Sequence, residues 1–95
     1  SSSTLKMRLI NGLTGAAVPL TLKADFAQIA TNVVPGTASA YGIAVGNTTM
    51  RLDVTSSSLT ALYSESNLNI PNNTVFTLFM LGDAAAPAHV LLRDR

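Results

Sequence analysis

Residues 49–55 decide the fold class, and they read Thr49-Met50-Arg51-Leu52-Asp53-Val54-Thr55. Apolar side chains alternate here with polar ones, and this period of two places them on opposite faces of a β-strand. The same alternation recurs along the chain between clusters of glycine, proline, asparagine and serine, which are typical of turns. No stretch of the sequence has the apolar period of a helix of normal length. The pattern therefore predicts an all-β protein.

Six further segments share the strand pattern, so that seven antiparallel strands are expected. They are residues 4–11, 18–25, 37–45, 62–70, 75–81 and 89–92. A short return strand that closes at Ile29 is also expected, and the last loop is assigned to residues 84–88. The strongest turn signals are Pro35-Gly36, Gly46-Asn47 and residues 71–74. Short, evenly spaced strands predict an immunoglobulin-like β-sandwich, with an open barrel as the competing architecture.

The strands differ in how deeply their patterns indicate burial. Residues 75–81 are almost continuously apolar, as expected of a central strand covered on both sides. In residues 62–70, the alternate positions expected to face the core include serines, and Tyr63 falls among the positions expected to face outward. These residues are therefore predicted to form an edge strand. Residues 38–44 carry only small side chains on one parity, which favours close approach by the opposite sheet or a large side chain over contact with a neighbouring molecule. Three aromatic side chains are assigned to the core: Phe26, Phe76 and Phe79.

The composition limits the class of protein. The chain has 95 residues, of which 47% are hydrophobic and 12% charged, and it contains no cysteine. We assign residues 1–4 to a flexible tail and residues 5–95 to one domain whose core needs neither disulfides nor metal. The net charge of +1 and the scattered basic residues exclude the clustered basic face that nucleic acids require. No segment has the roughly 18 consecutive apolar residues of a membrane span. The sequence begins at Ser1 without an apolar leader, so we expect a piece excised from a longer protein.

Catalytic chemistry has few candidates. Nucleophilic hydrolysis needs an oriented base, and His89 is the single histidine, which its position favours as a surface or boundary residue. Asp53 and Glu65 could form a catalytic carboxylate pair on adjacent strands, but an ion pair between Asp53 and Arg51 is an equally good interpretation. The carboxylates are dispersed and show no calcium-loop spacing. We predict a protein that is not an enzyme, with no catalytic, cofactor-binding or metal-binding residues.

Ligand binding has two weak candidates, both aromatic. Carbohydrate sites use exposed aromatic rings, and the chain has only two tyrosines and three phenylalanines. With the phenylalanines assigned to the core, Tyr41 and Tyr63 remain as ligand-binding candidates. The alternative is that their rings pack on the domain and their hydroxyl groups reach water.

Several segments resemble a bacterial secreted family, the one catalogued as domain of unknown function 4397. The resemblance covers most of the chain and is carried by Arg8-Leu9-Ile10-Asn11, Leu20-Thr21-Leu22-Lys23-Ala24-Asp25, Asn32-Val33-Val34-Pro35-Gly36-Thr37-Ala38-Ser39-Ala40-Tyr41 and Thr74-Val75-Phe76-Thr77-Leu78-Phe79-Met80-Leu81-Gly82. The chain departs from the family at Leu13-Thr14-Gly15, where Ser-Pro-Asp is frequent, and at Phe26, where glycine is usual. The resemblance implies a β-sandwich module of exported, cell-envelope or lipid-anchored proteins, and it implies no activity or cofactor.

The composition and the missing catalytic signals predict a non-catalytic structural or spacer module. The resemblance implies that it belongs to an exported bacterial protein, secreted or placed in the periplasm or cell envelope. The alternative is a binding or adhesion module that recognises a cell-surface glycan or protein. Residues 62–70 carry a single charge, Glu65, whereas natural strand edges are usually protected by charges, prolines or bulges. We therefore expect self-association, or pairing with tandem copies, through this edge strand.

Overall fold

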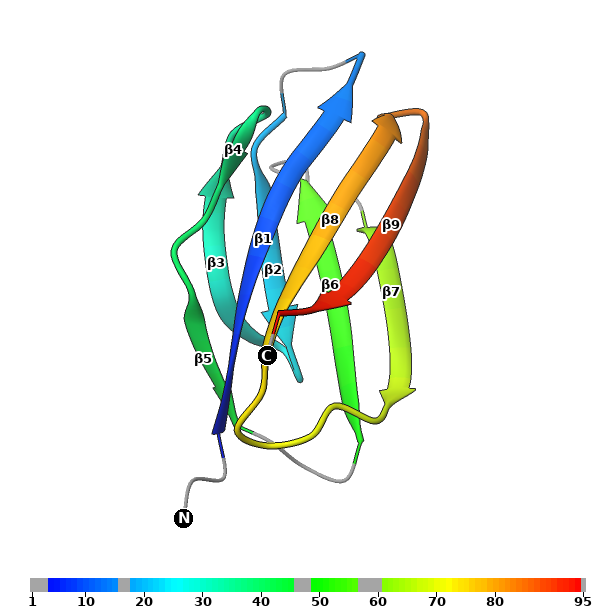
Figure 1. Ribbon diagram of the computed structural model, residues 1–95. Helices are drawn as coiled ribbons and strands as arrows, with labels where there is room; N and C mark the ends of the chain where they lie inside the picture. Colours follow the sequence, from blue (N-terminus) through cyan, green and yellow to red (C-terminus); the bar gives the residue numbers. More distant parts are fainter. Residues whose placement is uncertain (1–3, 16–17, 46–48, 57–60, 95) are drawn as a thin grey trace.

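The computed structural model describes residues 4–15, 18–45, 49–56 and 61–94. These residues form nine strand segments and no helix, and 74% of them lie in strands. The strands are β1 (Thr4–Thr14), β2 (Leu20–Ala24), β3 (Ala27–Val33), β4 (Thr37–Ala38), β5 (Gly42–Val45), β6 (Met50–Ser56), β7 (Ala61–Leu68), β8 (Val75–Asp83) and β9 (Ala86–Arg93) (Figure 1). The prediction of an all-β protein is confirmed. No described segment is a helix that could cross a membrane.

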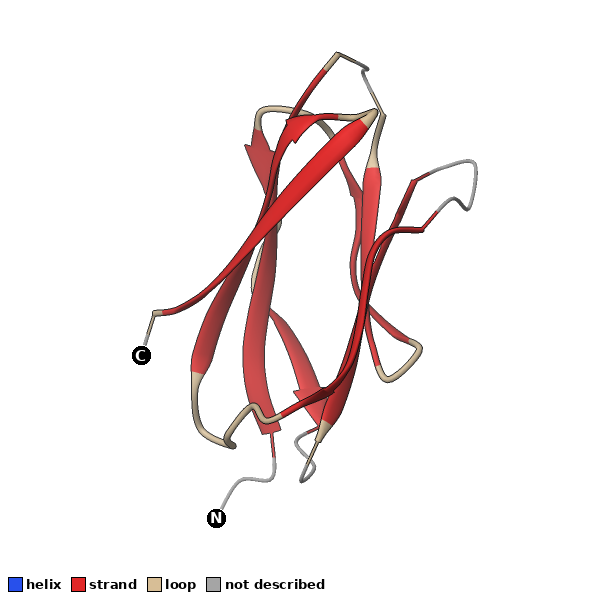
Figure 2. Ribbon diagram, turned by 90° about the vertical axis from the view of Figure 1, so that its right-hand side faces the viewer, coloured by secondary structure: helices blue, strands red, loops and turns tan. Residues whose placement is uncertain are grey.

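The strands form two sheets that pack face to face (Figure 2). Sheet A has five strands in the order β4, β1, β8, β9, and β5 also pairs with β1. Sheet B has four strands in the order β3, β2, β6, β7. The predicted edge strand at residues 62–70 corresponds to β7, which does lie at the edge of sheet B. The predicted central strand at residues 75–81 corresponds to β8, which lies between β1 and β9.

The core lies between the sheets and takes alternate residues from each strand. In β1 the buried side chains include Leu5, Met7 and Leu9, while Lys6 is exposed, as the period of two predicts. The other buried apolar side chains are Leu13, Leu20, Leu22, Ala24, Ala30, Val33, Ala44, Met50, Leu52, Val54, Tyr63, Ile70, Leu78 and Met80. Burial of these side chains removes apolar surface from water, which is the main force that holds the two sheets together.

The antiparallel prediction is wrong for one strand pair. β1 runs parallel to β8 over nine register pairs, from Lys6 opposite Val75 to Thr14 opposite Asp83. Figure 1 shows the two strands side by side and pointing in the same direction. Parallel neighbours need a long crossover connection, and here sheet B and the strands at the edge of sheet A lie between them in the sequence. Local patterns cannot show such a pairing.

The strand predicted at residues 37–45 is divided into β4 and β5 by Ser39. The Ser39 hydroxyl accepts a hydrogen bond from the Leu9 backbone N–H at 3.0 Å and donates one to the Ala40 carbonyl at 2.9 Å. Because a side chain takes the place of a backbone partner, the chain leaves the ladder between the two segments. At Gly42 the chain approaches β3 so closely that a Cβ atom would lie 2.5 Å from the Ile29 carbonyl oxygen. The opposite sheet thus explains the small residue at position 42.

Phe26 does not belong to the core, contrary to prediction. It lies with Asp25 in the two-residue turn between β2 and β3, where their φ angles are 69° and 49°. Both residues of a type I′ hairpin turn need positive φ. The Asp25 carboxylate accepts a hydrogen bond of 2.9 Å from the Arg51 N–H, whereas the Phe26 side chain lies outside the core. Phe26 is 70% exposed, and the Cζ atom of Arg51 lies 5.0 Å from its ring centroid. The other two phenylalanines of the predicted core are only partly buried.

Several boundaries and one parity also differ from prediction. β1 begins at Thr4, as the strand pattern predicted, but it continues to Thr14 instead of ending at residue 11. β3 is a full strand instead of a short return. β9 begins at Ala86 inside the predicted loop, and it tolerates Pro87 because an edge strand has a free side. In β7 the buried residue is Tyr63, which was predicted to face outward. Two register shifts interrupt the pairing of β7 with β6, and they change which residues of β7 face the core. The predicted turn at Gly46-Asn47 lies outside the described residues.

Asn11 ties the two sheets together at one end of the sandwich. Its side chain is fully buried, and Nδ2 donates hydrogen bonds to the carbonyl groups of Val18 at 3.0 Å and Val33 at 2.8 Å. Its Oδ1 accepts a hydrogen bond from the Leu13 N–H at 3.2 Å. A buried amide costs little only when its donors and acceptor are satisfied, as they are here. Asn11 therefore links β1 to the end of β3.

Candidate functional site

Tyr41 stands on the outer face of sheet A and is the more exposed of the two predicted ligand-binding residues. It follows the interruption between β4 and β5, and 41% of its surface is exposed. The Cζ atom of Arg8 lies 4.8 Å from the centroid of the Tyr41 ring, which is within the range of a cation–π contact. The Tyr41 hydroxyl donates a hydrogen bond of 2.8 Å to Oδ2 of Asp94. This polar corner therefore joins β1, the chain after β4 and the chain after β9.

Asp94 is the acceptor at the centre of the polar corner. The Thr77 hydroxyl donates to Asp94 Oδ2 at 2.6 Å, and Nε of Arg8 donates to the Thr77 Oγ1 at 3.0 Å. The hydrogen bond from Thr77, together with that from Tyr41 and the charge of Arg8, holds the pKa of Asp94 below its ordinary value. An adjoining hollow of about 300 Å³ is lined by Lys6, Tyr41, Val75 and Asp94. The corner thus offers an exposed ring edge beside charged donors and acceptors.

The position of Arg8, Thr77 and Asp94 around Tyr41 was not predicted from the sequence. Alternation places Arg8 on the outward face of β1, and this was the single available signal. Thr77 and Asp94 reach the corner because β8 pairs with β1 and β9 pairs with β8. Only the strand order brings these residues together.

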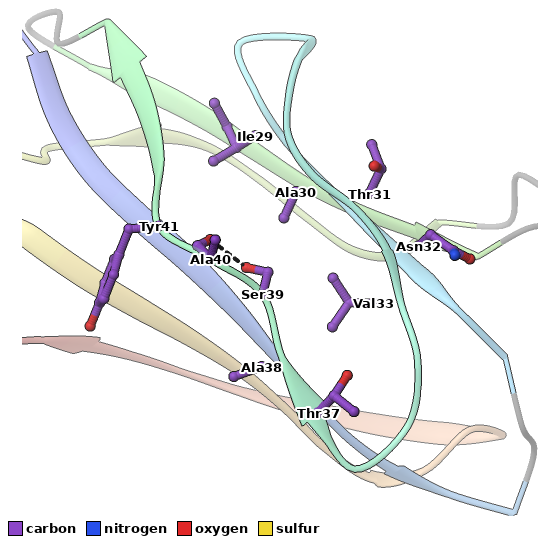
Figure 3. A pocket seen from close by; sticks show the side chains of 10 residues that line it. All are labelled: Ile29, Ala30, Thr31, Asn32, Val33, Thr37, Ala38, Ser39, Ala40 and Tyr41. Carbon is purple, nitrogen blue, oxygen red and sulfur yellow. Dashed lines mark hydrogen bonds between the residues drawn. The ribbon is translucent and has the colours of Figure 1, made fainter.

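A second hollow, of about 320 Å³, lies between β3 and residues 37–41 (Figure 3). Its wall contains hydroxyl and amide groups from Thr31, Asn32, Thr37 and Ser39, mixed with small apolar side chains. Figure 3 shows the Tyr41 ring pointing away from the other side chains that line this hollow. None of the lining residues carries a charge. The hollow has hydrogen-bonding groups for a neutral ligand but no acid or base.

Tyr63 is only 8% exposed, so it does not form the surface platform that the sequence suggested. Its ring packs on the His89 ring with centroids 4.1 Å apart, and its hydroxyl donates a hydrogen bond of 2.8 Å to Oε1 of Glu65. Burial and the neighbouring Glu65 carboxylate raise the pKa of Tyr63. His89 is partly exposed, as expected for a boundary residue, and its Nε2 lies 3.9 Å from Glu65 Oε1. The cluster joins β7 to β9 across the open side of the sandwich.

Asp53 and Glu65 lie on adjacent strands but do not form a catalytic pair. In the register of β6 and β7, Asp53 is opposite Ser64 and shares its outer face, whereas Glu65 is opposite the buried Leu52. Asp53 accepts hydrogen bonds from Nε of Arg51 at 3.0 Å and from the Ser64 hydroxyl at 2.7 Å. The ion-pair interpretation of Arg51 and Asp53 is confirmed.

The environment of Asp53 favours its charged form. Burial by itself raises the pKa of this carboxyl group, but the hydrogen bonds from Arg51 and Ser64 and the charges of Arg51 and Lys23 outweigh that effect and hold the pKa below its ordinary value. A carboxylate in this state is a poor proton donor near neutral pH. Within the described residues, no group of three or more histidine and carboxylate side chains is placed to hold a metal ion.

In comparisons with known proteins, no family model and no curated protein matches this sequence. The resemblance noted from individual segments therefore stays a prediction.

Proposed function

We propose that this domain is a non-catalytic structural module of an exported bacterial protein. The observation that carries the proposal is the use of its polar side chains to join strands. Asn11 links β1 to β3, Asp53 links β6 to β7, and Asp94 links the end of β9 to β8 through Thr77. Hydrogen bonds used in this way stabilise the fold and are not directed at a ligand.

The proposal includes a cellular location and a fold relationship. The secreted, periplasmic or cell-envelope setting is supported by the resemblance of residues 32–41 and 74–82 to the exported family. An immunoglobulin-like relationship is supported by the two packed sheets, each with its own edge strands.

A ligand screen by thermal unfolding tests the structural role. We expect the unfolding midpoint to stay within about 1 °C when cell-wall fragments, neutral glycans and charged glycans are added at millimolar concentration, because only a bound ligand stabilises the native state. A saturable rise in the midpoint with any one of these ligands would contradict the proposal.

The polar corner favours the alternative, a binding module for a cell-surface glycan. Tyr41 presents an exposed ring next to Lys6, Arg8 and Asp94, and glycan sites combine an aromatic ring with hydrogen-bonding groups of this kind. Under this alternative, Tyr41→Ala should abolish a saturable response to a glycan, whereas Tyr41→Phe should weaken it by loss of the hydroxyl alone. Tyr63→Phe, at a buried position, is the matched control and should leave the response unchanged.

A further inference from the structure

The outer face of sheet A carries most of the exposed apolar surface of the described residues. Six of the eight exposed large hydrophobic side chains are on this face: Tyr41 of the polar corner, and Ile43, Val45, Leu81, Val90 and Leu92. At its centre, Ile10, Phe79 and Val90 form one row across β1, β8 and β9. A continuous apolar row of this kind normally faces another sheet. We call this surface the apolar face.

Charged side chains mark the two ends of the apolar face. Lys6 lies four residues before Ile10 on β1, and Asp83 lies four residues after Phe79 on β8. Because β1 and β8 are parallel, Lys6 and Asp83 are on opposite sides of the central row, each about 13 Å from it. The end that holds Lys6 also carries Arg8 and Asp94, both hydrogen-bonded to Thr77, so among the described residues it has two cations and one anion. Its net charge is therefore opposite to that of Asp83, and the face is complementary to a reversed copy of itself.

We propose that the apolar face packs against the same face of a second copy of this chain, with a twofold axis along the row of Ile10, Phe79 and Val90. Rotation about this axis brings Lys6 of one copy beside Asp83 of the other, twice per dimer. This inference rests on the structural role proposed above and names the partner that the domain meets.

The same rotation matches side-chain sizes across the interface. Leu92 lies in the row of Thr77, and Ala88 lies in the row of Leu81, on the other side of the central row. In the dimer Leu92 therefore faces Ala88 and Leu81 faces Thr77, so that a larger side chain meets a smaller one in both pairs. Such pairing lets two sheets interdigitate at the usual spacing of about 10 Å.

The area of the face agrees with a weak dimer. Sheet A is four strands wide, because β4 and β5 pair with successive parts of the same edge of β1. Four strands at a spacing of about 4.8 Å and a length of nine residues give a footprint of about 600 Å² per copy. The total of about 1,200 Å² lies at the lower limit for specific interfaces. We therefore expect a dissociation constant on the order of 100 μM.

The edge strand predicted from the sequence is the competing surface. β7 has two register shifts in its pairing with β6, and Asn67 has a φ angle of 61°. Irregularities of this kind protect strand edges from pairing with another chain. The geometry thus favours the apolar face over the β7 edge.

Sedimentation equilibrium from about 10 μM to about 1 mM tests the proposal. We expect a monomer–dimer equilibrium, and we expect Val90→Lys or Leu92→Lys to raise the dissociation constant at least about tenfold, because each substitution buries a charge in the interface. Gln28→Lys adds the same charge to an exposed position in β3 of sheet B and should leave the constant within about twofold. Ser66→Lys, on β7, should do the same.

Exchange of the charges at the ends of the face tests the symmetry. Lys6→Glu and Asp83→Lys should each weaken the homodimer about threefold or more, since each places like charges together twice. An equimolar mixture of the two variants should regain wild-type association, because both contacts in the mixed dimer again join opposite charges. Asp83 also accepts a hydrogen bond from the Ala85 N–H, which Asp83→Lys would remove. Asp83→Asn keeps an acceptor at this position and removes only the charge, so it serves as a second variant for the loss of the Lys6 contact.

Three results would overturn the inference. They are a wild-type chain that stays monomeric at 1 mM, loss of the dimer in Ser66→Lys but not in Val90→Lys, and no recovery in the mixture of the two charge variants. The glycan screen is independent of sedimentation, so a monomeric chain with no ligand would remove the dimer and leave the structural role standing.

Discussion

The outer faces of the two sheets differ in the side chains of their central rows, which are polar on sheet B and apolar on sheet A. On sheet B, the row across β2, β6 and β7 consists of Lys23, Asp53 and Ser64, and Asp53 accepts a hydrogen bond from Ser64. On sheet A, the central row across β1, β8 and β9 consists of three apolar side chains, of which Val90 is 47% exposed. The row on sheet B satisfies its side chains within the chain. The central row on sheet A leaves apolar groups in contact with water, and the polar corner lies toward one end of that face.

This difference separates stability from interaction. Hydrogen bonds between neighbouring strands add to the stability of sheet B without a partner. Exposed apolar side chains add little to the stability of sheet A, but they gain free energy when a second surface covers them. Substitutions in the polar row of sheet B should therefore change unfolding, and substitutions of the exposed apolar side chains on the outer face of sheet A should change association.

The largest expected effect contrasts the two faces of sheet A itself. Leu78 on the inner face of β8 is fully buried, so Leu78→Ala should lower the free energy of unfolding by about 2 to 5 kcal/mol. Val90→Ala on the outer face should lower it by about 0.5 kcal/mol or less. Chemical denaturation at a monomeric concentration measures both values. Equal costs would show that the outer face is part of the core.

A smaller effect is expected from the polar row of sheet B. Asp53→Asn removes the negative charge from the pair with Arg51 and should lower the free energy of unfolding by about 1 to 2 kcal/mol. Val90→Thr, which is similar in shape to the native side chain, is the control on sheet A and should change it by about 0.5 kcal/mol or less. If Asp53→Asn proves neutral, the hydrogen-bonded row does not stabilise sheet B as proposed.

The loss of folding stability at acid pH should depend in part on the Asp53 carboxylate. The pKa of Asp53 and that of Asp94 are lower in the folded chain than their ordinary values, so the unfolded chain binds protons more readily. Their stabilising effect is therefore complete above pH of about 4 and is lost as the pH falls through the folded-state pKa values. Denaturation midpoints measured from about pH 7 down to about pH 2 follow the loss, since these limits lie on either side of the ordinary carboxyl pKa of about 4. Asp53→Asn should show a shallower decline, and an identical decline would remove Asp53 from this role.

The smallest expected effect concerns Phe26, the most exposed large hydrophobic side chain outside the apolar face. Replacement by glycine relieves a positive φ that costs about 1 to 2 kcal/mol, and it removes a cation–π contact with Arg51 worth about 0.5 to 1 kcal/mol. Phe26→Gly should therefore raise the free energy of unfolding slightly and leave self-association unchanged. Weaker dimerisation in this variant would show that the interface extends beyond sheet A and would end the contrast between the two faces.

Much of the fold could be predicted because alternation is a local property. The period of two in β6 and in the first half of β1 correctly placed Leu52 and Leu5 in the core and Arg51 and Lys6 outside it. The serines of β7 correctly indicated an edge strand. Prediction failed where alternation is broken, since the register shifts of β7 turned Tyr63 inward.

The candidate site was harder to predict because its residues come from distant parts of the chain. Tyr41 could be named as an aromatic candidate, but its partners Arg8 and Asp94 meet it only through the order of strands in sheet A. Phe26 was assigned to the core because aromatic side chains are usually buried, yet the turn after β2 needs two positive φ angles and directs the ring to solvent. Residue type was thus overridden by backbone geometry.

The sequence by itself determined that this chain forms strands, which residues of most strands face the core, and where most turns lie, because each of these properties depends on neighbours a few residues away. The tertiary structure alone decided that β1 lies parallel to β8, that Asp94 reaches Tyr41, and that an apolar row with opposite charges at its ends covers one outer face. These features depend on which strands pair, and pairing is selected by the burial and hydrogen bonding of the whole chain.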